Sequence, residues 1–172
     1  MTERRLELSG AVDHRAVRHA LGRFATGVAV VTTRTPDGKL EGLTANSFSS
    51  VSLDPPLVLW CLNRDAASAP GFAAAGMFAI NVLGAHQHAL SRHFATPIAD
   101  KFAGLAHTSG LGGCPLLDAS LAHFECRTEN AVDAGDHVIF IGRILRVTHR
   151  DGEPLIFSAG RYCVPALLAD AA

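Results

Sequence analysis

The segments Val28-Ala-Val-Val-Thr-Thr33 and Leu40-Glu-Gly-Leu-Thr44 flank the short sequence Pro36-Asp37-Gly38. The first segment is rich in β-branched residues, which fit the pleated surface of a β-strand. Proline, aspartate and glycine in succession favour a tight turn, because proline presets the torsion φ and glycine tolerates a positive φ. We therefore expect a β-hairpin over residues 28–44.

More strand patterns follow this hairpin. Ser47-Phe-Ser-Ser-Val-Ser52 alternates and stops at Pro55-Pro56. Leu57-Val-Leu-Trp-Cys-Leu62 is apolar throughout, which indicates a strand buried on both faces. The other expected strands are Met77–Val82, Ser120–Val132, the long strand His137–His149 after a turn at residues 133–136, and a last strand near Leu155–Phe157.

An amphipathic helix is expected near the N-terminus. Asp13 can cap its first turn, and Gly27 is placed to end it. Its apolar positions recur at the helical period and are Val17, Ala20, Leu21 and Phe24.

Two shorter helices are expected, one between Ser68 and Gly76 and one across His86–Phe94. The segment Ala95–Leu117 is expected to be a long loop. A loop of this length in a compact domain is often functional, so it is a candidate lid.

The order of these elements predicts the fold class. Short strands separated by turns, with few helices and no strand-helix alternation, exclude a doubly wound nucleotide-binding fold and indicate a mainly β, antiparallel barrel. We expect one domain over residues 13–165, with tails at 1–12 and 166–172. The motifs G-x-G-x-x-G, the P-loop, G-x-S-x-G and H-E-x-x-H are absent from the sequence, so the commonest kinase, hydrolase and zinc-protease mechanisms lose their support.

The composition narrows the range of partners. The chain has 172 residues, of which 48% are hydrophobic and 18% charged, with a formal net charge of -1. Its mean hydropathy is +0.22. A near-neutral chain has no overall basic field, so we expect neither a nucleic acid nor a membrane as partner. The high share of apolar residues has two possible explanations: the apolar side chains line a large ligand pocket, or they are buried in a subunit interface.

The location and the redox state are also expected from the sequence. No apolar run is long enough to span a membrane, and residues 1–8 are too charged for a secretory signal, so the expected location is the cytoplasm. Four scattered cysteines without C-x-x-C spacing are expected to be reduced thiols. His86, His88 and His93 have no carboxylate at ligand spacing, so no metal site is expected.

Three segments are candidates for binding chemistry. Gly42–Ser52 is rich in hydroxyl groups and suits a planar polar heterocycle, although a plain polar edge strand has the same composition. Asn63–Ser68 follows a strand and is either a phosphate-binding segment or a solvated loop. In Gly135-Asp136-His137, Asp136 could orient His137 to bind a cofactor phosphate or donate a proton, and the alternative is a plain hairpin turn.

Six motifs in order resemble those of the short-chain flavin reductase family. They are Phe24-Ala-Thr-Gly-Val28, Gly42-Leu-Thr-Ala-Asn-Ser-Phe48, Ser50-Val-Ser-Leu-Asp-Pro-Pro-Leu57, Phe78-Ala-Ile-Asn-Val-Leu83, Asp100-Lys-Phe-Ala-Gly104 and Gly135-Asp-His137. The resemblance covers residues 12–162. It implies an FMN-binding split β-barrel that forms a homodimer, with flavin near the subunit interface. It also implies reduction of FMN or FAD by NADH or NADPH, and delivery of reduced flavin to a partner monooxygenase.

The same resemblance assigns site residues. The flavin ring would lie along Thr44, Ala45, Asn46 and Ser47, and its site would continue over Ser50, Val51 and Ser52. The ribityl phosphate would be held by Cys61, Leu62, Asn63, Arg64 and Ser68. The residues that would close the site are Phe94, Lys101, Phe102 and Tyr162. His137 would position the nicotinamide.

The lack of an acid-base pair agrees with this function. In hydride transfer the chemistry belongs to the two cofactors, so the protein mainly aligns them and excludes water. Two other readings stay open: a non-catalytic FMN carrier on the same barrel, and a related oxidase or haem-binding split-barrel protein.

Overall fold

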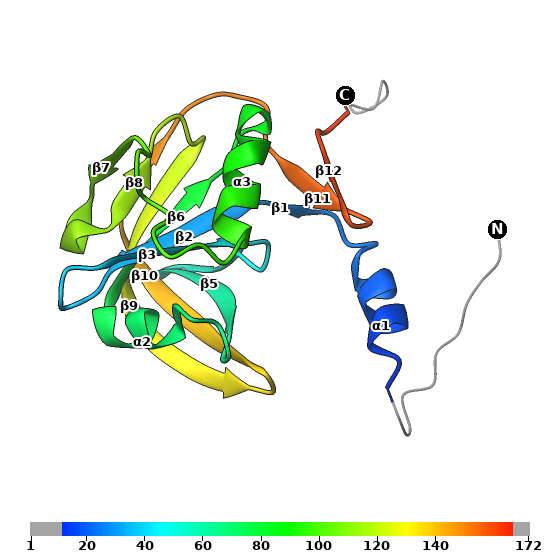
Figure 1. Cartoon of the computed structure of the whole chain (residues 1–172), viewed down its shortest axis with the longest axis horizontal. Helices are drawn as coiled ribbons and strands as arrows, with labels where there is room; N and C mark the ends of the chain where they lie inside the picture. The colour runs from blue at the N-terminus through cyan, green and yellow to red at the C-terminus, as the bar shows by residue number, and fades with distance from the viewer. Residues whose placement is uncertain (1–11, 167–172) are drawn as a thin grey trace.

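A single antiparallel sheet of seven strands curls into a barrel in the computed structural model, which describes residues 12–166 (Figure 1). Its strands, in sheet order, are β3 (Leu40–Ala45), β2 (Ala29–Arg34), β6 (Met77–Val82), β9 (Ala122–Ala134), β10 (His137–His149), β5 (Pro56–Asn63) and β4 (Ser49–Leu53). The edge strands β3 and β4 are consecutive in the chain. The sheet therefore has an open seam between them, which confirms the expected split barrel.

The hairpin expected over residues 28–44 is confirmed as β2 and β3. These strands pair antiparallel, with Val31 opposite Leu43, and Gly38 in the connecting turn has a φ of +90°. The strands expected at Met77–Val82 and His137–His149 are confirmed with the same bounds.

Aromatic rings fill the inside of the barrel. Trp60 on β5 is fully buried and stacks on Phe140 of β10, with ring centroids 4.9 Å apart. Phe72 and Phe78 meet the same indole edge to face, at 5.0 and 5.8 Å. Since aromatic side chains bury large apolar areas, this cluster contributes a large share of the packing energy.

The expectation that Leu57–Leu62 is buried on both faces is wrong. Buried and half-buried residues alternate along β5, with Val58, Trp60 and Leu62 facing the barrel interior. An antiparallel sheet can be covered on one face only. The outer face of β5 carries Leu57, Leu59 and Cys61, which remain half-buried.

The remaining strands form two small sheets. One contains β1 (Thr26–Gly27), β11 (Ile156–Ser158) and β12 (Arg161–Cys163), and the other contains β7 (His107–Ser109) and β8 (Pro115–Leu117). The helical elements are α1 (His14–Leu21), α2 (Ala69–Ala75), η1 (Ala85–Gln87), α3 (His88–Ala95) and η2 (Leu111–Gly113). The segment 95–117 is thus only partly a loop, and β12 was not expected from the sequence.

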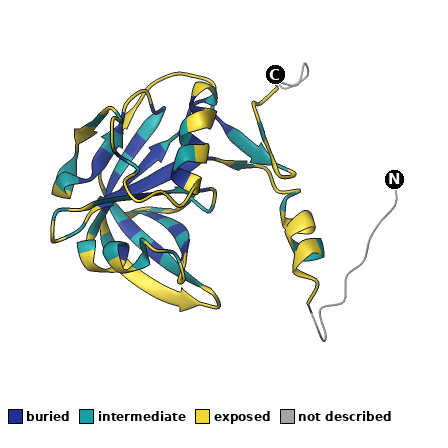
Figure 2. Ribbon diagram, in the orientation of Figure 1, coloured by how far each residue is buried: buried dark blue, intermediate teal, exposed yellow. Residues whose placement is uncertain are grey.

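Helix α1 starts as expected but ends earlier. The Asp13 carboxylate accepts hydrogen bonds from the amides of Arg15 and Ala16, at 3.0 and 3.1 Å. The helix ends at Gly22 rather than Gly27, because Gly27 pairs with β11 in the small sheet. No residue of α1 is buried, and the helix lies apart from the barrel (Figure 2).

The expected tails at 1–12 and 166–172 fall almost entirely outside the described residues, and the domain bounds stay a prediction. No helix within residues 12–166 is long and apolar enough to cross a membrane.

Glu125 on β9 is a buried carboxylate that anchors the segment around η2. It is 1% exposed and accepts hydrogen bonds from both the Arg146 guanidinium and the Leu111 amide, the latter at 2.6 Å. Burial raises the pKa of Glu125, but the bonds from Arg146 and Leu111 more than offset this, so the pKa lies below its ordinary value of 4.5.

Glu125→Gln is expected to lower the free energy of unfolding by about 1–3 kcal/mol near neutral pH. A lowered folded-state pKa means that ionised Glu125 stabilises the fold fully above its ordinary pKa and loses this effect as the pH falls below it. Urea unfolding of both proteins at about pH 7 and about pH 3.5 checks this. A difference that stays constant between the two pH values would contradict the role of the charge.

Candidate functional site

The open seam of the barrel carries the hydroxyl-rich segment. β3 and β4 each have a single strand neighbour among the described residues, so each has one edge without strand partners. Between them, the Ser47 hydroxyl accepts a hydrogen bond from the Cys61 amide at 2.9 Å and lies 3.3 Å from the Cys61 carbonyl. This contact fixes the seam against β5 and leaves Asn46 exposed.

The flavin-ring positions expected from the sequence differ in exposure. Thr44, Ser47 and Ser52 are half-buried, Asn46, Ser50 and Val51 are exposed, and Ala45 is buried. Ser50 and Ser52 pair with Val58 and Leu57 of β5. The segment therefore presents polar side chains together with an edge-strand backbone.

A second group of residues lies together at one end of the barrel. We name it the rim cluster, and it consists of Asn63, Arg64, Asp133, Asp136 and His137. The Arg64 amide donates to the Asp136 carbonyl at 3.0 Å, and its guanidinium lies 3.0 Å from the Asp133 carboxylate. His137 stands opposite Asn63 in the β5–β10 register. The segments 63–68 and 135–137, which are far apart in the sequence, are thus neighbours.

The imidazole of the rim cluster is held by its neighbour in sequence. His137 Nδ1 lies 2.7 Å from Asp136 Oδ1. This hydrogen bond lowers the pKa of Asp136, with a further contribution from the charge of His14 on α1. When Nδ1 donates to the carboxylate, Nε2 is the ring atom left for a ligand. The expected orienting role of Asp136 agrees with this geometry.

Tyr162 belongs to a group of hydrogen bonds around Ser91 that the sequence did not predict. Its hydroxyl lies 2.8 Å from the Ser91 hydroxyl, and Thr44 donates to the Ser91 carbonyl at 2.6 Å. The Arg92 guanidinium lies over the Tyr162 ring, 5.8 Å from its centroid. Ser91 is fully buried on α3 and joins the C-terminal hairpin to the seam. A serine on the same helix face as Phe94, three residues away, was the available signal.

Phe94 and Phe102 are packing residues. They are 0% and 7% exposed, and their ring centroids lie 5.2 Å apart. They pack against Gly42, where a Cβ atom would come within 2.6 Å of the Phe94 ring. The two rings therefore support β3 by packing on it at Gly42. Their direct contact with flavin stays a prediction.

Lys101 ties the segment after α3 to the same strand. Its ammonium group donates to the carbonyls of Gly42 and Phe94, at 3.1 and 2.7 Å. Burial lowers the pKa of Lys101. Two of the three N–H groups of the ammonium are thus bonded within the protein. The contact of Lys101 with flavin stays a prediction.

The remaining predicted phosphate-site residues lie near the rim cluster. The Asn63 carboxamide accepts from the Asp65 amide at 2.8 Å, and Ser68 caps α2 without a side-chain hydrogen bond. Leu62 is buried and can offer only its backbone, whereas Cys61 is half-buried. In the described part of the chain, no three side chains of metal-binding type converge.

The sequence of this chain matches that of a known domain. The model of the family described as "Flavin reductase like domain" matches residues 21–166. The chain belongs to this family. Most of α1 precedes the matched part, whereas the seam, the rim cluster and Tyr162 lie within it.

Individual family members are similar over most of the chain. It is 49% identical over 153 residues to "FMN reductase (NADH) SmoA" of Agrobacterium fabrum, covering 89% of this chain and 87% of that protein. It is 39% identical over 153 residues to "Flavin-dependent monooxygenase, reductase subunit HsaB" of Rhodococcus jostii, covering 88% and 78%.

Solved structures of flavin reductases share the fold. The NADH:FAD oxidoreductase SgcE6 of Streptomyces globisporus, solved with NAD and FAD fragments, superposes with a TM-score of 0.86 at 38% identity. The match covers 97% of this chain and all of that one.

Proposed function

We propose that this protein is an NADH-dependent flavin reductase that supplies reduced flavin to a partner flavin-dependent monooxygenase. Family membership and the similarity to SmoA and HsaB support this function. The observation that carries it in this chain is the β5–β10 register, which sets His137 opposite Asn63 and brings the Arg64 amide to the Asp136 carbonyl.

The donor set of this chain fits a flavin. The edge-strand backbone and polar side chains of 44–52 suit the polar edge of a planar ring system, because they offer hydrogen bonds without bulk. Arg64, whose side chain is 42% exposed, and the uncommitted Ser68 hydroxyl suit a phosphate. Flavin, when bound, supplies the hydride-accepting chemistry.

The residues of this chain hold and orient the reactants. The Ser47 hydroxyl accepts from the Cys61 amide and so holds the seam on β5. The Thr44 hydroxyl donates to the Ser91 carbonyl and is held in place by it. His137, oriented by Asp136, offers Nε2 to the nicotinamide nucleotide. Since no general base is required, alignment and exclusion of water are the main tasks of the protein.

The proposal also includes the choice of flavin, the choice of nicotinamide nucleotide and the location in the cell. We take FMN as the preferred flavin, with FAD as the alternative, and NADH rather than NADPH as the donor. The proposed location is the cytoplasm. Similarity to an NADH-dependent FMN reductase supports the first two choices.

The decisive experiment mixes the purified protein with NADH or NADPH and with a catalytic or excess amount of FMN or FAD, and follows nicotinamide absorbance. We expect rapid NADH oxidation that depends on free flavin. Flavin binding without oxidation of either nucleotide would contradict a reductase and favour the non-catalytic carrier.

A homodimer is also proposed, with flavin near the subunit interface. Large apolar side chains remain uncovered in one copy: Leu21 is 68% exposed, Phe24 79% and Leu53 92%. A helix as short as α1 is marginal alone in water, so a covering partner would stabilise it. Light scattering is expected to give twice the chain mass of 18.1 kDa. A monomer at every concentration tested would contradict the dimer.

A further inference from the structure

The arginine of the rim cluster is held by the hairpin that faces it. The Arg64 amide donates to the Asp136 carbonyl at 3.0 Å, and the Arg64 guanidinium lies 3.0 Å from a carboxylate oxygen of Asp133. Arg64 directly follows β5, whereas Asp133 lies on β9, and β10 runs between these two strands. The side chain of Arg64 therefore reaches across β10 to make this ion pair.

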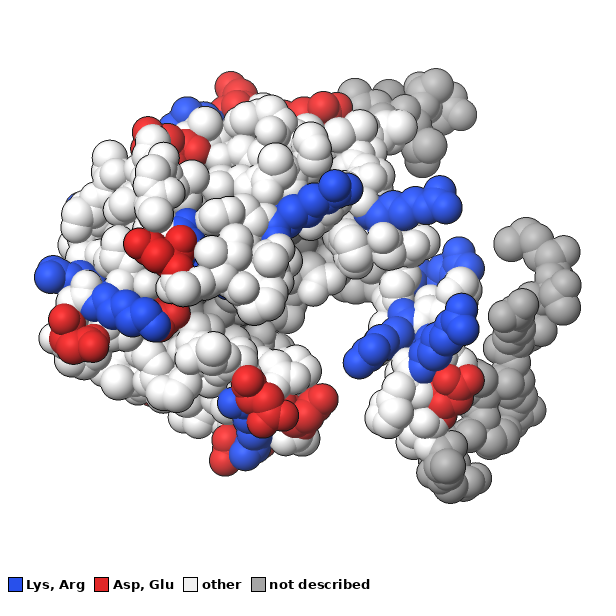
Figure 3. Space-filling model, in the orientation of Figure 1, with Lys and Arg blue, Asp and Glu red and all other residues white. Residues whose placement is uncertain are grey.

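The rim cluster is not a basic site. It contains the carboxylates of Asp133 and Asp136 and the guanidinium of Arg64. Asp136 is bonded to His137, so Asp133 is the carboxylate that neutralises Arg64. Figure 3 shows acidic side chains gathered with basic ones at the lower end of the barrel, where the β9–β10 hairpin ends. An anionic ligand that approaches Arg64 therefore finds the guanidinium already paired.

An ion pair of this kind can be exchanged for a ligand. The side chains of Arg64 and Asp133 are 42% and 74% exposed, so water screens their attraction and the pair adds little to stability. A phosphate monoester carries more charge than one carboxylate and can offer two oxygens to the guanidinium. It can therefore displace Asp133, but it must first break the ion pair and then remain near the displaced carboxylate. Both effects weaken its binding.

We propose that Asp133 is a specificity-determining residue, which lowers the affinity of the site for the phosphate of FMN by competing for Arg64. The proposal rests on the proposed function, because that function supplies the flavin. Asp133 acts on the flavin through Arg64, so its effect is confined to flavins that carry a phosphate. Riboflavin has the same ring without the phosphate and is insensitive to Asp133. A weakened phosphate contact also favours release of the reduced product to a partner.

The test is Asp133→Asn, which keeps the size of the side chain and removes its charge. The side chain is largely exposed, so the fold should be retained. Quenching of flavin fluorescence measures the dissociation constants of oxidised FMN and of riboflavin, without a nicotinamide nucleotide. We expect the constant for FMN to fall about three- to tenfold and that for riboflavin to stay within about twofold. Asp133→Glu restores the carboxylate and should restore the weaker binding of FMN.

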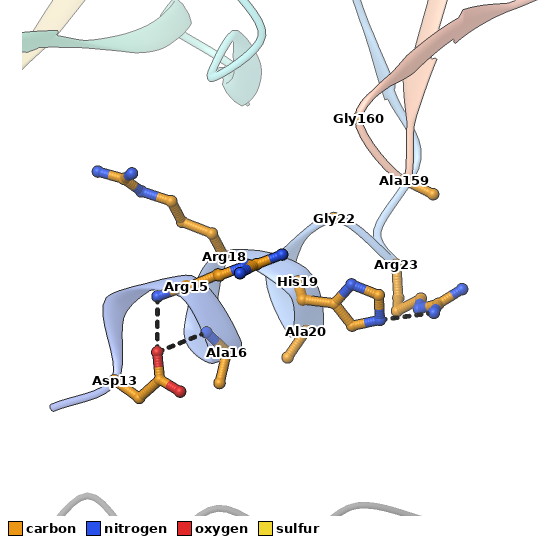
Figure 4. A pocket seen from close by; sticks show the side chains of 10 residues that line it. All are labelled: Asp13, Arg15, Ala16, Arg18, His19, Ala20, Gly22, Arg23, Ala159 and Gly160. Carbon is orange, nitrogen blue, oxygen red and sulfur yellow. Dashed lines mark hydrogen bonds between the residues drawn. The ribbon is translucent and has the colours of Figure 1, made fainter. Parts of the chain in front are cut away.

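Matched variants separate the ion pair from the general charge of the surface. Asp65→Asn removes an exposed carboxylate directly after Arg64 in the chain and should leave the FMN constant within about twofold. Arg64→Gln should raise the FMN constant about tenfold, and adding Asp133→Asn to it should change the constant by no more than about twofold. The control for Arg64→Gln is Arg18→Gln, which removes one of the exposed arginines that Figure 4 shows on α1.

An unchanged FMN constant in Asp133→Asn would overturn the proposal. An equal fall for FMN and riboflavin would also overturn it, because a residue that acts on the phosphate has no means to alter the binding of a flavin without one. An equal fall in Asp65→Asn would replace the ion pair by a general charge effect, and a larger rise in Arg18→Gln than in Arg64→Gln would place the phosphate at α1 instead. NADH oxidation by the unmodified protein tests the proposed function separately: without it that function fails, while the two flavin constants still decide the role of Asp133.

Discussion

Trp60→Ala is expected to lower the free energy of unfolding by about 3–5 kcal/mol, which is a large fraction of the stability of a domain of this size. The indole is fully buried and contacts the rings of Phe140, Phe72 and Phe78. Removing it leaves a cavity at the point where β5, β10, β6 and α2 meet, and rigid neighbouring rings cannot collapse into it. Far-UV circular dichroism during urea unfolding measures the loss.

Trp60→Phe is the matched control for this prediction. The indole Nε1 is buried, and no hydrogen-bond partner for it is found among the described residues. A buried donor without a partner costs about 1–3 kcal/mol, so phenylalanine keeps most of the packing and removes this cost. We expect a change within about 1.5 kcal/mol. If both variants lost the same stability, ring packing would not be the source of the effect.

The fold could be predicted because its strands carry local signals. The hairpin at 28–44 has a turn sequence that favours a tight turn for a physical reason. β6 is a mostly apolar run and β10 is rich in β-branched residues, so the ends of both strands can be predicted from the sequence. β12 was missed because three residues, Arg161–Cys163, carry no period, and their pairing with β11 depends on a turn with Ala159 at positive φ. The end of α1 was misplaced because Gly22 and Gly27 are equally suited to end a helix, and only sheet pairing distinguishes them.

The sequence predicted individual segments of the site but not which of them lie together in space. The motifs indicated Arg64 and His137 separately, but their proximity follows from the register of β5 on β10, which local sequence does not encode. Ser91 was missed because a buried serine on a helix looks like any other small residue until its partners Tyr162 and Thr44 are known. Phe94 and Phe102 were assigned to the flavin by resemblance, whereas the side chains themselves are buried against Gly42.

His137→Ala is expected to raise the apparent KM for NADH by about ten- to a hundredfold, with the KM for flavin changed by no more than about threefold. Each factor of ten corresponds to about 1.4 kcal/mol of lost binding. The reason is geometric: Asp136 holds Nδ1 at 2.7 Å, so Nε2 has a fixed direction, and its loss removes a positioned contact without disturbing the seam. Since His137 positions the nucleotide and does not transfer a proton in this proposal, kcat should fall much less than kcat/KM.

Two further variants make this prediction specific. Asp136→Asn keeps an oxygen acceptor for Nδ1 but removes the charge, so it should raise the KM for NADH by a smaller factor than His137→Ala. His149→Ala changes an exposed histidine at the far end of the same strand and should leave both KM values unaltered. Steady-state kinetics with NADH and flavin varied in turn gives all three results. Equal increases for NADH and flavin in His137→Ala would mean that the imidazole supports the barrel rim in general, because a residue that positions only the nicotinamide nucleotide has no contact through which it could weaken flavin binding.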